Sequence, residues 1–173
     1  MNEVTGAHVG ALISDYVGVL DGPQDQSFQI FELLGLAREN GCRTAILSND
    51  PGGPGAAPLR DLVGSVVDDV VLSGDVGFGK PDRRIFELVA RRLGVPTRAC
   101  VFIDDSPVNV WGAVDAGMIG VHHVDAAATV REVRILLAMN EQNEGGSSVA
   151  PTAHNQDEHA HNQDEHGETP HHE

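Results

Sequence analysis

The chain has 173 residues, a formal net charge of −15, an apolar fraction of 40% and an aromatic fraction of only 4%. These values indicate one domain with an aliphatic core, and the negative charge argues against nucleic acid and anionic membranes as partners, because their phosphates would repel it. The N-terminus lacks the features of a signal peptide and no apolar run approaches the ~20 residues of a membrane-spanning helix, so we expect a cytoplasmic protein.

Five short aliphatic runs predict β-strands, and the amphipathic segments between them predict helices. In chain order, strands are expected over residues 8–15, 43–49, 66–72, 99–105 and 119–124, and helices over 26–40, 57–64, 82–94, 107–117 and 126–139. In the first helix, four apolar residues recur at three-residue steps and are expected to form one face: Phe28, Phe31, Leu34 and Ala37. Gly41 is expected to end that helix, and Pro81 is expected to be the first residue of a later one.

Strands that alternate with helices predict βαβ units, and therefore an α/β fold: a three-layer, Rossmann-like α/β/α domain with a central parallel sheet. We assign residues 1–140 to this domain. Residues 141–173 hold eight acidic side chains, no Lys or Arg and almost no large apolar residues, so this tail is predicted to be disordered. Cys42 and Cys100 adjoin strand-like runs, and we interpret them as reduced core thiols rather than as a disulfide.

Polar residues end three of the predicted strands: Asp15, Ser48–Asn49 and Asp104–Asp105. In an open α/β sheet, ligands bind outside the carboxyl ends of the strands. We therefore expect these polar side chains to converge on one crevice.

Each candidate residue has a functional and a structural interpretation. Asp15 is either a metal ligand and nucleophile or the start of a turn before a glycine-rich loop. The Ser48–Asn49 pair either binds the oxygens of an anion or caps a helix or Asx turn. Lys80 either neutralises a phosphate beside a helix N-terminus or is a solvated surface lysine. The Asp104–Asp105 pair either forms an oxygen site suited to Mg²⁺ or caps the next helix.

The order of these residues along the chain is more informative than any one of them. An Asp after the first strand, a Ser after the second, a Lys before a helix and an Asp-Asp pair after the fourth strand resemble the four motifs of the haloacid dehalogenase-like (HAD) hydrolase superfamily. The matching stretches are LISDYVGVL, TAILSND, GDVGFGKPDRRIFELVARRLGV and ACVFIDDSPVNVWGAVDAGM, and the resemblance spans about residues 8–124. The last two stretches resemble one branch of that superfamily in particular.

The resemblance implies a chemistry for each residue. Asp15 would be the nucleophile that forms an aspartyl-phosphate and a ligand of Mg²⁺. The remaining protein ligands would be Asp105, Asp104 directly or through water, and the backbone carbonyl of Val17. Ser48 and Lys80 would act in catalysis by binding the phosphoryl oxygens, with Asn49 beside them. The cation and the lysine would offset the repulsion between a carboxylate nucleophile and an anionic substrate.

Val17 departs from the family pattern. Most phosphatases of the family carry a second aspartate two residues after the nucleophile, where it protonates the leaving oxygen and later activates water. A valine side chain can do neither, and general acid–base help is worth about 10²–10⁴-fold. We therefore expect acyl or aryl phosphates to be better substrates than ordinary phosphate esters. Dehalogenation is not expected, because the Asp104–Asp105 pair favours a metal site that the dehalogenases lack.

A second departure is the short spacing between the motifs. Residues 20–43 hold only a loop and one helix, and residues 50–79 hold one helix and one strand, so we expect no cap domain. An open site suits a phosphorylated small molecule or macromolecule, and a second copy or a protein partner is expected to close it.

The tail carries six of the nine histidines, at positions 154, 159, 161, 166, 171 and 172. Imidazole is a good ligand for Ni²⁺ and Zn²⁺, so the tail is either a transition-metal binder or a solvated acidic segment. His122 and His123 are expected to lie in the fifth strand with structural roles. For the whole chain, two functions compete: a phosphohydrolase with a weakened acid–base step, which we favour, and a catalytically impaired binding or scaffold protein.

Overall fold

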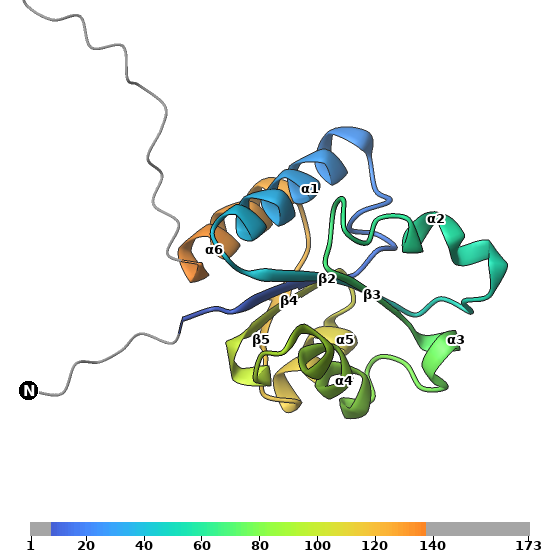
Figure 1. Ribbon diagram of the computed structural model, residues 1–173. Coiled ribbons are helices and arrows are strands. Elements are labelled where there is room, and N and C mark those ends of the chain that lie inside the picture. The colour runs from blue at the N-terminus through green and yellow to red at the C-terminus, as the bar shows by residue number, and fades with distance from the viewer. Residues whose placement is uncertain (1–7, 138–173) are drawn as a thin grey trace, which may run out of the picture. The chain divides into compact units, whose positions relative to one another are not determined.

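The computed structural model describes residues 8–137. Its centre is a parallel five-stranded sheet with the strand order β3-β2-β1-β4-β5 (Figure 1). The strands are β1 (Ala11–Ser14), β2 (Arg43–Ser48), β3 (Asp69–Leu72), β4 (Cys100–Asp104) and β5 (Ile119–His122). Because β1 is the central strand, the chain changes direction across the sheet between β1 and β4, and this is where open α/β sheets bind ligands.

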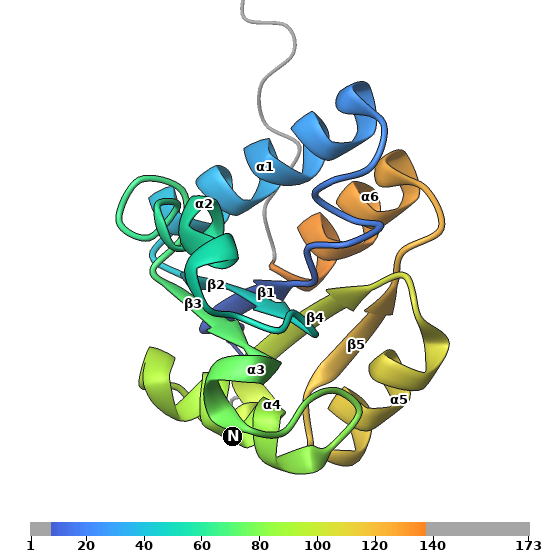
Figure 2. The same cartoon turned by 90° about the vertical axis from the view of Figure 1, so that its right-hand side faces the viewer.

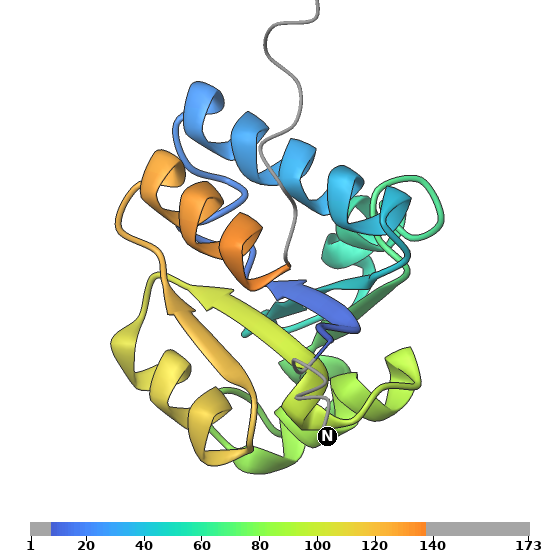
Figure 3. The ribbon, with the colours of Figure 1, turned by 90° about the vertical axis from the view of Figure 1, so that its left-hand side faces the viewer.

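Helices cover both faces of the sheet, which confirms the predicted three-layer α/β/α fold. The helices are α1 (Gln24–Glu39), α2 (Ala57–Arg60), α3 (Ser73–Val76), α4 (Arg83–Leu93), α5 (Pro107–Asp115) and α6 (Ala126–Leu136), with 3₁₀ turns at Pro54–Ala56 and Thr97–Ala99. Figures 1 and 2 show α1 and α6 on one face and α4 and α5 on the other. The α1 and α6 helices lie side by side, as Figure 3 shows from the opposite direction. None of the described helices is long and apolar enough to cross a membrane.

The core consists of two apolar layers because neighbouring strand residues point to opposite faces of the sheet. Leu12 of β1 belongs to the layer under α1 and α6, whereas Ile13 belongs to the layer over α4 and α5. Both side chains are fully buried. Phe86 and Phe102 fill the second layer with an edge-to-face contact at 5.2 Å between ring centroids. Burial on both sides explains why the strands read as continuous aliphatic runs.

The predicted buried face of α1 was confirmed at Leu34 and Ala37 but wrong at Phe28, which is 60% exposed. The buried residues of the helix are Ser27, Ile30, Leu33, Leu34 and Ala37. A helix turns about 100° per residue, so each three-residue step falls about 60° short of a full turn. The run from Phe28 to Ala37 therefore drifts around half of the helix circumference. Gly41 follows the helix with φ 83°, which confirms its predicted role as the stop.

Two further expectations about local structure need correction. Pro81 is not the first residue of a helix, because α4 begins at Arg83 and Asp82 is its N-cap, with a side chain that accepts from Arg84 N. The short helix α3 was not predicted, because its four residues are too few to show a helical period. The other elements are found where predicted, with ends that differ by a few residues. Residues 141–173, with the predicted disorder and histidine ligands, lie outside the described residues.

Both cysteines are free and buried. Burial raises the pKa of the Cys100 thiol to about 11 and also raises that of Cys42. A neutral thiol is a poor nucleophile and a poor metal ligand, so neither cysteine is a candidate for chemistry.

Candidate active site

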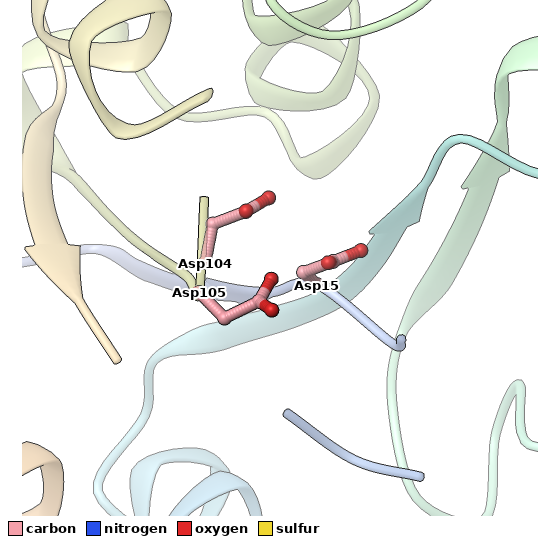
Figure 4. A group of neighbouring side chains, drawn as sticks. All are labelled: Asp15, Asp104 and Asp105. Carbon is pink, nitrogen blue, oxygen red and sulfur yellow. The ribbon is translucent and has the colours of Figure 1, made fainter. Parts of the chain in front are cut away.

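Three carboxylates meet at the carboxyl ends of β1 and β4. Asp15 directly follows β1, Asp104 is the last residue of β4, and Asp105 is the next residue along the chain. The two strands are hydrogen-bonded neighbours, with Ser14 opposite Ile103, so the residues that follow are brought together. Each residue offers one oxygen, and the three oxygens lie within 4.8 Å of one another (Figure 4). This spacing allows one cation to contact all three residues.

Lys80 enters the same site from the loop between α3 and α4. Its ammonium Nζ lies 2.6 Å from Asp15 Oδ1 and 2.7 Å from Asp104 Oδ2. The lysine side chain is only 1% exposed, which excludes the solvated surface lysine considered above. One ammonium faces three carboxylates, so the site keeps an excess of negative charge. Buried charge without a partner is costly, and a divalent cation would balance this site.

Asp15 titrates abnormally in this setting. Burial raises the pKa of its carboxyl above the ordinary value, and the ammonium of Lys80 lowers the pKa without cancelling that effect. The negative charge of Asp104 raises it further. The ionised form of Asp15 is therefore less stable in the folded protein than in water, which is the situation that a bound cation would relieve.

Asp104 uses both of its carboxylate oxygens on protein donors. Ser106 N donates to Oδ1 at 2.8 Å, and Asn109 Nδ2 lies 3.1 Å from each oxygen. Together with Lys80 these groups hold a fully buried carboxylate in place. Asp105, in contrast, is exposed, and its carboxylate accepts no hydrogen bond within residues 8–137. Asp15 and Asp105 are thus the two carboxylates with free oxygens, and Asp104 is placed to orient Lys80.

The loop after β1 packs its backbone against Asp105. Tyr16 O accepts from the backbone N–H groups of three later residues, which folds residues 16–21 into a tight turn. Gly18 has φ 83°, and a Cβ at this position would lie 2.5 Å from Asp105 Oδ2. Only glycine permits this approach. Val17 lies beside it with 59% of its surface exposed, and its backbone carbonyl accepts no hydrogen bond from the described part of the chain.

Ser48 and Asn49 lie at the end of β2, beside the same site. Ser48 is 1% exposed, and its hydroxyl makes no hydrogen bond within the described chain. Asn49 binds the backbone of Lys80 twice, because its Oδ1 accepts from Lys80 N at 2.8 Å and its Nδ2 donates to Lys80 O at 2.9 Å. Neither residue forms the helix cap or Asx turn considered above. Asn49 fixes the loop that carries the lysine, and one of its N–H groups remains free for a substrate oxygen.

Three further residues contact the site: Asn109, which had no role assigned from the sequence, and His122 and His123, which were expected to have structural roles. Asn109 lies in the first turn of α5, where its spacing from Asp104 allows the contact described above. His122 Nε2 lies 3.0 Å from the backbone oxygen of Asp105, and His123 N donates to Asp104 O at 2.9 Å. His123 follows β5 rather than lying in it, and its ring contacts Thr129 Oγ1. Burial lowers the pKa of His123, which favours the neutral ring in this contact.

Comparisons with known proteins agree with this geometry. The chain is 37% identical over 111 residues to Phosphatase MT3486 of Mycobacterium tuberculosis, covering 60% of this chain and 47% of that protein. It is 28% identical over 134 residues to the sesquiterpene phosphatase astK of Aspergillus oryzae, covering 76% of this chain and 66% of that protein. The matches thus span about half to two thirds of these relatives.

A solved structure of an uncharacterised protein from Corynebacterium glutamicum is also similar. It shares 44% sequence identity, with a TM-score of 0.74, and the match covers 78% of this chain and 99% of the other. The family model for haloacid dehalogenase-like hydrolases matches residues 7–117, a segment that contains Asp15, Ser48, Lys80 and the Asp104–Asp105 pair. The chain therefore belongs to the haloacid dehalogenase-like hydrolase family.

Proposed function

We propose that the protein is a Mg²⁺-dependent phosphohydrolase that acts through an aspartyl-phosphate on Asp15. The observation that carries this proposal is the buried Lys80 ammonium, which contacts Asp15 and Asp104 while the oxygens of Asp105 stay free. Three oxygen ligands at this spacing suit Mg²⁺, which prefers carboxylates and carbonyls. When bound, Mg²⁺ would neutralise phosphoryl oxygens and the nucleophile together. The phosphatase names of two relatives agree with this activity.

The residues divide the reaction between them. An Asp15 oxygen attacks phosphorus and forms an acyl phosphate, while the bond to the leaving oxygen breaks and that oxygen keeps the electron pair. Water then attacks phosphorus, which releases inorganic phosphate and regenerates the Asp15 carboxylate. An ammonium has three N–H groups, and Lys80 uses two on carboxylates, so one remains for a phosphoryl oxygen. The free Ser48 hydroxyl supplies another donor. Asp15, Asp105 and the Val17 carbonyl would hold the cation, with Asp104 in support.

The leaving oxygen receives no proton from Val17, and this predicts a strong dependence on the leaving group. We expect acetyl phosphate, whose leaving group needs no proton, to be hydrolysed about 10²-fold faster or more than a sugar phosphate. Steady-state kcat/KM values with Mg²⁺ measure the difference. Equal rates, or a faster sugar phosphate, would contradict the proposed role of position 17.

Mg²⁺ should stabilise the folded protein, because the cation offsets the excess negative charge of the site. At a metal concentration about a hundred times Kd we expect about 2.7 kcal/mol of additional unfolding free energy. Thermal unfolding with Mg²⁺ and with a chelator measures this effect. Asp105→Asn should abolish most of the gain, whereas Asp61→Asn, at an exposed position away from the site, should keep it. An equal gain in both variants would show that the cation binds elsewhere.

A second candidate function is a catalytically impaired binding or scaffold protein, and Val17 is the observation that favours it. Between the first and second motifs the structure has α1, and between the second and third it has the 3₁₀ turn at Pro54–Ala56, α2, β3 and α3, so we propose an open, capless site. A second copy or a protein partner would then cover it.

We further propose that residues 1–140 form the hydrolase domain and that the tail, residues 141–173, binds Ni²⁺ or Zn²⁺ independently of that domain.

A further inference from the structure

Exposed apolar side chains border the candidate active site. The exposed fractions are 59% for Val17, 56% for Val108 and 75% for Val124. Large apolar side chains this exposed are ordinary when they are scattered, but a group of them beside a binding site indicates what the site accepts. Their positions in the chain tie all three to the groups that surround Asp15 and Lys80.

Each valine is connected to the site by contacts of its neighbours in sequence. Val17 precedes Gly18, whose backbone lies against the Asp105 carboxylate. Val108 lies between Ser106 and Asn109, which both donate to Asp104. Val124 follows His123, whose backbone N–H donates to Asp104 O. The three side chains therefore come from three different loops or helix starts that meet at the carboxyl edge of the sheet.

Two nearby carboxylates of these loops are engaged in local structure. Asp21 Oδ1 accepts from Gly18 N at 2.6 Å, and Asp125 Oδ1 accepts from Ala128 N at 2.8 Å as the N-cap of α6. Both are thus held toward their own loops, and the free carboxylate of Asp105 is the proposed ligand of the metal. An apolar group would remove the valine surfaces from water.

We propose that the leaving group of the natural substrate is apolar, an aryl or apolar acyl group that packs on Val17, Val108 and Val124 while its phosphate faces Lys80. This inference rests on the proposed function for the phosphate, but it concerns the polarity of the leaving group and not its acidity. One turn after Val108, α5 carries a further exposed apolar side chain, that of Trp111, which is 69% exposed. A leaving group longer than one ring would reach it.

The test compares two ligands that differ only in apolar area and cannot be hydrolysed. Benzylphosphonate and 4-tert-butylbenzylphosphonate are titrated calorimetrically into the full-length protein with Mg²⁺. We expect the tert-butyl compound to bind about five- to tenfold more tightly, which is the range for a few added carbon atoms on a partly open apolar surface. Equal affinities in the wild-type protein would overturn the proposal.

Matched variants locate the effect. Val17→Thr and Val124→Thr keep the shape of the side chain but add a hydroxyl, and together they should reduce the affinity ratio to about twofold or less. The same change in Val63→Thr, an exposed position in the loop before β3, should leave the ratio unchanged. A ratio that survives in the double variant would overturn the assignment to these valines.

Turnover of the corresponding phenyl and 4-tert-butylphenyl phosphates separates this inference from the proposed function. The two phenols have nearly the same acidity, so leaving-group chemistry does not bias the comparison. Higher kcat/KM for the tert-butyl ester supports both proposals. Selective phosphonate binding without any hydrolysis supports the apolar site and contradicts the phosphohydrolase. Hydrolysis without selectivity supports the phosphohydrolase and contradicts the apolar site.

Discussion

Replacing Val17 by aspartate is expected to raise kcat/KM for a sugar phosphate by about 10²–10⁴-fold, the usual value of general acid–base help. Position 17 lies two residues after Asp15, in a turn held by backbone hydrogen bonds and by the Asp21 carboxylate, none of which involves the Val17 side chain. The side chain there is 59% exposed, so a carboxylate can replace the valine without burial of a new charge. The new carboxyl would protonate the leaving oxygen and then activate the attacking water.

Two controls identify the origin of such a gain. Val17→Asn has a similar size but no exchangeable carboxyl proton, so it should remain as slow as the wild type. Acetyl phosphate, which needs no protonation, should gain little from Val17→Asp. The variant should also acquire a new limb in its pH–rate profile. If Val17→Asp and Val17→Asn behave alike on the sugar phosphate, the site lacks more than a proton donor, and the binding or scaffold function becomes the better description.

Asp15→Asn is expected to reduce turnover by about 10³–10⁶-fold, because an amide cannot form the acyl phosphate. The same variant should be more stable than the wild type when no metal is bound. In the wild type, two carboxylates contact one ammonium, so the trio of Asp15, Asp104 and Lys80 has a net negative charge in a buried place. The substitution leaves a neutral pair and removes a charge whose burial is unfavourable.

The pH dependence of this stability difference follows from the raised pKa of Asp15. A carboxyl with a higher pKa in the folded state lowers stability at pH values above that pKa, and the loss disappears as the pH falls below the unfolded value. The advantage of Asp15→Asn should thus be full at neutral pH and vanish in acid. Thermal unfolding in a chelator from pH 7 to below the ordinary carboxyl pKa of 3.8 measures it, with Asp61→Asn as a control. A variant less stable than the wild type at neutral pH would refute this account.

The convergence of three site residues on one edge of the sheet could be predicted from the sequence alone. Asp15, Ser48 and Asp104 each end an aliphatic run, and parallel strands bring such ends to one edge of the sheet. Their positions at or directly after the ends of β1, β2 and β4 agree with that expectation. The position of Lys80 in the site was harder to predict, because Lys80 does not follow a strand. Its burial depends on the backbone contacts with Asn49, which join residues 31 positions apart and leave no periodic signal.

Other features were out of reach for similar reasons. The buried face of α1 depends on where the helix meets the sheet, and a sequence period of three fits that face poorly. Asn109 lies in one of the stretches that resemble the family motifs, but the sequence does not show which residue it contacts. Its contact with Asp104 depends on the start of α5 shortly after the end of β4. The role of Gly18 is set by the nearby Asp105 carboxylate, which lies almost 90 positions later in the chain.

Asn49 recognises residue 80 through main-chain atoms alone. Every amino acid except proline offers the same N–H and C=O groups, so the loop should keep its path whatever side chain residue 80 carries. The charge at position 80 and the main-chain path of its loop therefore depend on different interactions. A neutral residue at position 80 would leave the buried carboxylates of Asp15 and Asp104 without a counter-charge, so the cost of such an exchange would be electrostatic and would not arise from the path of the loop.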